Sequence, residues 1–213
     1  MKISETVLGV IDVQPDFLPG GPLAVPEGDK VLAPVNHLLG LGFAAAFATQ
    51  DWHPPGHASF ASAHPGRAPF ETILMPYGPQ VLWPDHCVAG TPGAALAPGL
   101  DQRRLRAIIR KGMDKEIDSY SAFFENDRHT ATGLAGYLAT IGARGLALCG
   151  LALDYCVAWS AEDAAGLGFS VTVIEDACRA IALPGPDGDT LSAARARLAA
   201  AGVRFATVAA LTA

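Results

Sequence analysis

Short apolar segments alternate with helix-like segments along the chain, and this alternation constrains the fold more than any other feature. Aliphatic and β-branched residues dominate 6–13, 42–51, 105–111, 145–152, 170–176 and, as a strand or tail, 203–211. Helical patterns occupy 28–41, 130–143, 154–168 and 188–202. Strands that alternate with helices in this way form parallel sheets covered on both faces. The sequence therefore predicts an α/β fold, with three α/β/α layers around a mostly parallel six-stranded sheet.

One long segment interrupts this pattern. Residues 52–100 are rich in proline and glycine and show little periodicity. A loop of that length in a compact protein is usually functional or disordered. Because the 213 residues contain no internal repeat and no linker, we expect a single domain over 1–213 with a long insertion at about 52–100.

The composition argues against several classes of protein. Half of the residues are hydrophobic, 17% are charged and the formal net charge is −6, which disfavours both disorder and a nucleic-acid-binding surface. No apolar run is long enough for a membrane span, and the first residues do not read as a signal peptide. We expect a cytoplasmic protein with reduced thiols. The sequence is compatible with a homo-oligomer but does not predict one.

Four reactive side chains fall at or just beyond the carboxyl ends of predicted strands. They are Asp12, Asp51, Lys111 and Cys156. Ligands of open α/β sheets bind beyond these ends, where the strand order reverses. We therefore expect the four side chains to meet in one crevice.

Cys156 is the candidate nucleophile. Asp154 reads as an N-cap, which places Cys156 in the first turn of a helix, where the dipole is expected to lower the pKa of a thiol. Asp12 is placed to exchange the proton and Lys111 to stabilise the thiolate. Each residue also has a plain structural interpretation, as a buried cysteine, a turn residue or a surface lysine. The other cysteines, Cys87, Cys149 and Cys178, are expected to be inert.

The stretch DWHPPGH at 51–57 is a candidate metal site. Asp51, His53 and His57 place one carboxylate and two imidazoles within seven residues. Alternatively, these side chains merely line a polar loop. His37, His64 and His129 are assigned no role.

Six stretches, in this order and over most of the chain, resemble the nicotinamidases (pyrazinamidases) of the isochorismatase-like cysteine hydrolase superfamily. They are DVQPDFLPGGPLAV at 12–25, DWHPPGHASFA at 51–61, WPDHCVAGTPGA at 83–94, RKGMDKEIDSYSAFFEN at 110–126, GLALDYCVAWSAEDA at 150–164 and EDACRAI at 175–181. The resemblance implies the Rossmann-like fold of that superfamily. It also implies a catalytic triad of Asp12, Lys111 and Cys156.

The resemblance assigns further roles by position. It implies an oxyanion hole from the N–H groups of Ala152 and Cys156, with a cis peptide between Leu151 and Ala152. The residues that would bind a flat substrate ring are Phe17, Trp83, Tyr120 and Leu151.

The resemblance also extends the metal site and implies the reaction. It adds His86 to Asp51 and His53 as a ligand, and leaves His57 as a direct ligand, a ligand through water or a lining residue. One divalent transition metal, zinc, iron or manganese, suits such a set. The implied reaction converts nicotinamide, and also pyrazinamide, to the acid and ammonia through a thioester, with the metal orienting the ring.

Two departures from the family pattern leave alternatives open. Pro15 stands where asparagine is usual, and Leu153 stands where threonine is usual. The substrate could therefore be another small carboxamide or carbamoyl compound. An iron oxygenase built on Asp51, His53 and His86, or a non-catalytic binding module, would leave the triad residues unexplained.

Overall fold

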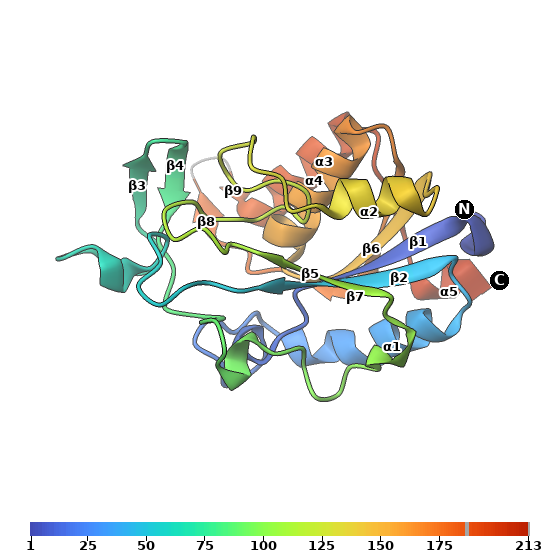
Figure 1. The fold of residues 1–213 in the computed structure, drawn as a ribbon, viewed down its shortest axis with the longest axis horizontal. Coiled ribbons are helices and arrows are strands. Elements are labelled where there is room, and N and C mark those ends of the chain that lie inside the picture. The colour runs from blue at the N-terminus through green and yellow to red at the C-terminus, as the bar shows by residue number, and fades with distance from the viewer. Residues whose placement is uncertain (186–187, 213) are drawn as a thin grey trace.

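A computed structural model describes residues 1–185 and 188–212, and its centre is one parallel sheet (Figure 1). The strands are β1 Thr6–Ile11, β2 Ala45–Asp51, β5 Ala107–Lys111, β6 Gly145–Leu151, β7 Ser170–Arg179 and β10 Arg204–Ala206. They lie in the order β10-β7-β6-β1-β2-β5, and every neighbouring pair is parallel. The predicted six-stranded parallel sheet is confirmed.

Helices form the two outer layers. The short α5 and α1 lie on one side of the sheet in Figure 1, and three helices lie on the other. The bounds are α1 Leu32–Gly40, α2 Leu134–Thr140, α3 Ala158–Gly166, α4 Thr190–Ala200 and α5 Val208–Thr212. Short 3₁₀ turns cover Ile3–Glu5, Pro15–Phe17, Gly28–Val31, Ala61–Ala63, Pro92–Ala94 and Gln102–Arg104. None of the helices within the described residues is long and apolar enough to cross a bilayer.

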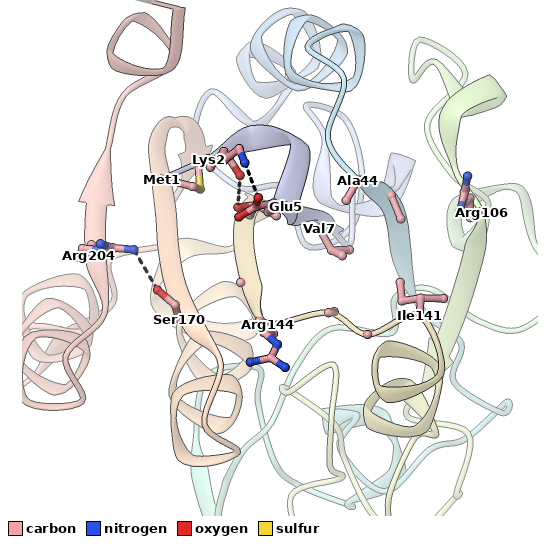
Figure 2. Close-up of a pocket in the computed structure, with 15 residues that line it drawn as sticks. Met1, Lys2, Glu5, Val7, Ala44, Arg106, Ile141, Arg144, Ser170 and Arg204 are labelled. Carbon is pink, nitrogen blue, oxygen red and sulfur yellow. Dashed lines mark hydrogen bonds and ion pairs between the residues drawn. The ribbon is translucent and has the colours of Figure 1, made fainter.

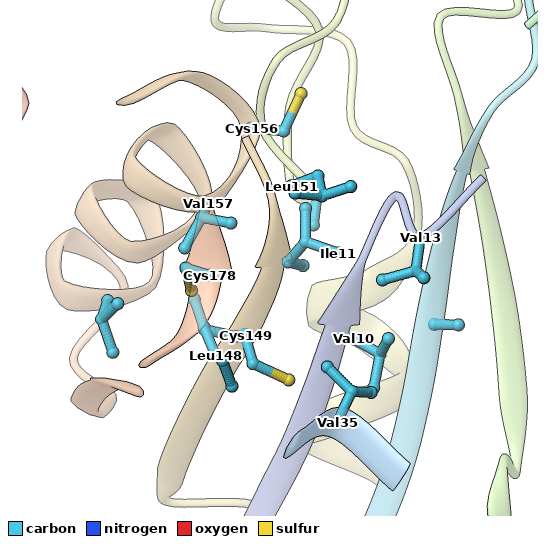
Figure 3. Close-up of a cluster of buried hydrophobic side chains, with 14 of the residues drawn as sticks. Val10, Ile11, Val13, Val35, Leu148, Cys149, Leu151, Cys156, Val157 and Cys178 are labelled. Atoms are coloured by element: carbon cyan, nitrogen blue, oxygen red, sulfur yellow. The ribbon is translucent and has the colours of Figure 1, made fainter. Parts of the chain in front are cut away.

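The central strands are apolar along their whole length because both of their faces are covered. Every residue of β1 is buried, and Val10, Ile11 and Leu148 pack together in the core (Figure 3). Gly9 is required at the middle of β1, since a Cβ there would lie 2.6 Å from both Leu148 Cδ2 and Phe47 Cζ. Tight packing of β1 fixes the position of the residues that follow its end.

The long segment at 52–100 is more ordered than its composition suggests. It contains an antiparallel hairpin, formed by β3 Thr72–Met75 and β4 Gly78–Val81, that stands apart from the central sheet (Figure 1). Two very short strands, β8 Pro184–Gly185 and β9 Gly188–Asp189, pair antiparallel.

Two predicted elements differ in length. The helix predicted over 130–143 begins only at Leu134, because Gly133 adopts a left-handed φ of 96° before it. Strand β7 continues past the predicted end at 176 to Arg179, after a register shift against β6 between Leu148 and Gly150. The acidic pair at 175–176 therefore lies where the pairing with β6 is irregular, and the strand continues beyond it.

The predicted start of the helix over 154–168 is wrong. A π-helical turn, Leu153–Val157, precedes α3, and the residue before it is Ala152. The Asp154 carboxylate does not cap this turn, because it accepts hydrogen bonds from Ile181 N, Ala182 N and Thr190 Oγ1. Asp154 thus ties the turn to the segment after β7.

Candidate active site

Three strands carry reactive side chains at their carboxyl ends, on the same side of the sheet. Asp12 follows β1, and the pairing of β2 with β5 places Asp51 opposite Lys111. This edge lies at the carboxyl ends of the strands, beside the point between β1 and β6 where strand order reverses. Asp12, Asp51 and Lys111 are all buried, so their charges must be paired within the protein.

Lys111 connects the site. Its ammonium lies 2.9 Å from Asp12 Oδ2 and 3.4 Å from Cys156 Sγ. It also pairs with Asp51 Oδ1 and donates to the carbonyl of Ser119 at 2.8 Å. One buried cation therefore contacts both carboxylates and the thiol.

Burial and this cation together set the protonation of the carboxyl groups. Burial disfavours both carboxylates, but Lys111 and two histidines more than offset it at Asp51, whose pKa lies well below the usual range. At Asp12 burial prevails, helped by the nearby Asp51 charge, so the pKa of Asp12 is raised despite Lys111. Burial would lower the pKa of Lys111, yet the two acids raise it well above its usual value. Asp12 is thus the better base of the two acids.

The backbone and one hydroxyl hold Asp12 in place. Asp12 has a φ of 47°, in the left-handed region that a non-glycine residue occupies only under constraint. Thr49 Oγ1 accepts from Asp12 N at 3.1 Å and donates to Asp12 Oδ1 at 2.5 Å. The second oxygen, Oδ2, is left to face Lys111.

Cys156 joins the acids, but its electrostatics differ from the expectation. Carboxylate oxygens of Asp12 and Asp51 and the sulfur of Cys156 all lie within 4.8 Å of one another. Burial raises the pKa of the Cys156 thiol well above its usual value, and Lys111 offsets only part of that effect. The expected lowering of the thiol pKa is wrong, because burial outweighs the effect of Lys111. A raised pKa favours the protonated thiol, so attack by the sulfur requires a base.

The peptide bond between Leu151 and Ala152 is cis, as the resemblance implies. Ala152 and Cys156 both line the pocket beyond the sheet. Leu151 does not line it, because its side chain is fully buried in the core (Figure 3). Cys149 and Cys178 lie in the same apolar cluster, whereas the sulfur of Cys156 points away from it.

The two sequence departures fit the local backbone. Pro15 begins the 3₁₀ turn Pro15–Phe17, where a residue without an N–H group is well tolerated. Leu153 begins the π turn and is buried. Asp16, to which the sequence assigned no role, accepts from Cys87 N at 2.7 Å and so ties the turn that carries Phe17 to the segment that carries His86.

Asp51, His53 and His86 form a second cluster that shares Asp51 with the first. The Nε2 atoms of His53 and His86 lie 3.7 and 3.8 Å from Asp51 Oδ2. Each Nδ1 atom is held by a carbonyl, Gly112 O at 3.0 Å and Pro84 O at 2.8 Å. This arrangement directs both Nε2 lone pairs to one point.

The donor set fits a divalent transition metal. His53 Nε2 is buried and has no hydrogen-bond partner, which would be costly for a polar atom that served no ligand. One carboxylate and two imidazoles with room for further ligands are typical of zinc, iron or manganese sites.

His57 lies beside this cluster, and both of its ring nitrogens already have protein partners. Nδ1 contacts Ser59 Oγ at 2.8 Å, and Nε2 contacts the carbonyls of Asp114 and Ile117 at 2.8 and 3.3 Å. The ring packs against His53, with centroids 4.3 Å apart. His57 therefore packs against the His53 ring and helps to hold it in position.

A pocket connects the two clusters. Its lining combines the candidate nucleophile, two candidate metal ligands, a further carboxylate and several aromatic or aliphatic side chains, namely Phe17, Leu23, Asp51, Trp83, His86, Asp118, Tyr120, Ala152, Tyr155, Cys156 and Ile181. The predicted ring-binding residues Phe17, Trp83 and Tyr120 are among them.

Sequence reasoning gave no role to four of the lining residues, Leu23, Asp118, Tyr155 and Ile181. All four lie within stretches that match the family, so a signal was present. Ile181 reaches the pocket through the Asp154 contacts, which no sequence pattern reveals.

A larger pocket lies at the amino ends of the strands, opposite the candidate active site (Figure 2). Its lining includes the first residues of five strands, Thr6, Ala45, Gly145, Ser170 and Arg204. It contains none of the triad residues, and open α/β sheets bind ligands at the other edge. The smaller pocket, which contains Cys156, is therefore the candidate active site.

Comparisons with known proteins agree with this geometry. The Isochorismatase domain model matches residues 6–210. The nicotinamidase of Acinetobacter baylyi is 53% identical over 184 residues, which cover 86% of each chain. A nicotinamidase/pyrazinamidase structure from Acinetobacter baumannii superposes with a TM-score of 0.94 at 46% identity and covers 99% of this chain and 100% of that one.

A solved structure with a metal is also similar. The pyrazinamidase of Pyrococcus horikoshii in complex with zinc gives a TM-score of 0.75 at 33% identity, covering 95% of this chain and 99% of that one. The chain therefore belongs to the isochorismatase family, within its nicotinamidase/pyrazinamidase group.

Proposed function

We propose that this protein is a nicotinamidase, which hydrolyses nicotinamide to nicotinate and ammonia and accepts pyrazinamide as well. The observation that carries the proposal is the contact of one buried ammonium, Lys111, with both Asp12 and Cys156 at the wall of an aromatic pocket. Its relatives are named nicotinamidase or nicotinamidase/pyrazinamidase, which supports nicotinamide and pyrazinamide as substrates.

The first step is activation of the thiol. Asp12, with its raised pKa, takes the proton of Cys156, and Lys111 stabilises the thiolate that forms. The sulfur then attacks the carboxamide carbon and forms a carbon–sulfur bond. The negative charge moves to the carboxamide oxygen, where the N–H groups of Ala152 and Cys156 receive it.

The second half of the reaction reuses Asp12. Asp12 returns its proton to the departing nitrogen, the carbon–nitrogen bond breaks and ammonia leaves. Asp12 then takes a proton from water, whose oxygen attacks the thioester. The carbon–sulfur bond breaks, the acid leaves, and the thiolate regains its proton from Asp12.

Substrate orientation depends on the rest of the pocket. Phe17, Trp83 and Tyr120 provide walls for a flat ring. Asp51, His53 and His86 would hold one divalent transition metal, and that metal would supply an electrophile that anchors a ring nitrogen. We assign His57 no direct bond to it, because both nitrogens of His57 are engaged.

Ammonia release from a panel of amides tests this function. We expect turnover of nicotinamide and pyrazinamide, and loss of turnover by at least about a thousandfold in Cys156→Ala, because the variant has no nucleophile. A wild-type protein that releases ammonia only from carbamoyl compounds would instead be a related amidase. Activity in Cys156→Ala close to wild type would exclude the covalent route.

A further inference from the structure

The hairpin β3–β4 projects from the molecule, yet one of its polar side chains is fully buried. Gln80 is 0% exposed, whereas Leu74 on the facing strand is 82% exposed. Burying an amide is costly unless its hydrogen bonds are made within the protein. The buried Gln80 amide must therefore have specific hydrogen-bond partners within the protein.

The amide of Gln80 contacts four side chains from both of its ends. Nε2 donates to Asp118 Oδ2 at 2.6 Å and to the Tyr120 hydroxyl at 3.0 Å, and it also donates to the backbone carbonyl of Val81 at 2.7 Å. Oε1 accepts from the Tyr77 hydroxyl and from Asn126 Nδ2, both at 3.2 Å. Gln80 is thus the centre of a network and not an isolated pair.

The two side chains that accept hydrogen bonds from Nε2 belong to the active-site pocket. Asp118 and Tyr120 line it, and the Tyr120 hydroxyl accepts from Trp83 Nε1 at 3.3 Å. Trp83 stands edge-on to Tyr120 and to Tyr155, with ring centroids 6.2 and 4.9 Å away. The orientation of the aromatic wall is therefore linked to Gln80 through the Tyr120 hydroxyl.

We propose that Gln80 is a positioning residue that sets the orientation of Tyr120 and Trp83, and thereby determines how tightly the pocket binds a flat ring and which ring it prefers. The inference rests on the proposed function for its substrates. Gln80 does not line the pocket and makes no hydrogen bond to Asp12, Lys111 or Cys156, so it acts through the wall alone.

Replacing Gln80 with methionine separates this role from stability. Gln80→Met keeps the length of the side chain and removes the hydrogen bonds from Nε2 to Asp118 Oδ2 and to the Tyr120 hydroxyl, while the Trp83 hydrogen bond to Tyr120 remains possible. We expect KM for nicotinamide to rise about tenfold, kcat to change less than about threefold, and the preference for nicotinamide over pyrazinamide to change. Near-ultraviolet circular dichroism, which reports the packing of aromatic rings, should change as well.

Two further variants complete the experiment. Ile73→Thr alters the residue that faces Gln80 across the hairpin without touching the network, so it should lower Tm but leave KM and the near-ultraviolet spectrum unchanged. Tyr77→Phe removes one donor to Gln80 and should raise KM by a smaller factor in the same direction. This second variant keeps the test decisive if Gln80→Met does not fold.

The outcomes distinguish the two hypotheses. Unchanged KM, substrate preference and near-ultraviolet spectrum in folded Gln80→Met and Tyr77→Phe would overturn the positioning role. If the wild type hydrolyses neither amide, the proposed function fails, and the near-ultraviolet spectra of the same variants still decide whether Gln80 orients the wall.

Discussion

Lys111 is the residue on which the electrostatics of the site most depend. An ammonium with no exposed surface would be unstable alone, and two carboxylates beside each other would be unstable without it. The same contact reaches Cys156 Sγ at 3.4 Å. Lys111 therefore compensates both acids and contacts the proposed nucleophile, and its removal would leave both acids without their ammonium partner.

Glu125 shows how burial behind the site affects stability. It accepts hydrogen bonds from Gly112 N at 3.2 and 3.3 Å, and Gly112 O holds His53. Burial raises the pKa of Glu125 from 4.5 to about 7. As the pH rises, the unfolded chain releases the Glu125 proton at a lower pH than the folded protein does. The stability contributed by the protonated form is therefore lost between about pH 4.5 and 7.

We predict that Glu125→Gln, which mimics the protonated acid, gains stability relative to wild type over this pH window. The gain should reach up to about 3 kcal/mol by pH 8 and be small at pH 4.5. Urea denaturation at the two pH values measures it, with Glu116→Gln as an exposed control. If the difference in the free energy of unfolding between Glu125→Gln and wild type does not vary with pH, the pKa of Glu125 is not raised in the folded protein.

At the scale of elements, close packing of the central strands holds the catalytic side chains in register. Strand β1 lies between β2 and β6, and a Cβ at Gly9 would meet side chains from both neighbours at 2.6 Å. The last residue of β1 directly precedes Asp12. A shift of this strand would therefore move the base away from Cys156.

Two glycine substitutions test this packing in opposite directions. Gly9→Ala should destabilise the protein by about 1–3 kcal/mol, because the methyl group overpacks the core. Gly136→Ala, in α2 with no atom within 4 Å of the added Cβ, should stabilise it by up to about 1 kcal/mol. Thermal unfolding of both variants measures the effects, which correspond to about 2–4 °C per kcal/mol. Equal Tm values for the two variants would contradict the described packing.

For the whole molecule, the sequence predicts best those features that depend on periodicity and chain order. The parallel sheet and the meeting of Asp12, Asp51, Lys111 and Cys156 follow from strand ends that share one edge. The buried π turn and the hydrogen bonds of Asp154 do not follow, because they depend on contacts with the segment after β7. The raised pKa of Cys156 does not follow either, because it depends on burial of the thiol in the folded protein.

The long segment at 52–100 marks the same limit. Its low periodicity hid the hairpin β3–β4, and no local pattern connects Gln80 to Asp118, 38 residues further along the chain. Family resemblance named His86 and the ring-binding residues, but only the fold places Leu23 and Ile181 in the same pocket.

Direct observation of the thioester on Cys156 tests the central claim most closely. Wild-type protein mixed with nicotinamide and quenched in acid within one turnover should carry a nicotinoyl group on the peptide that contains Cys156, detected by mass spectrometry. Cys156→Ala should carry none, and Asp12→Asn should accumulate none because its thiol keeps its proton. Turnover by the wild type with no adduct on that peptide at any quench time, together with turnover in Cys156→Ala, would contradict a shared role of these residues in one covalent reaction.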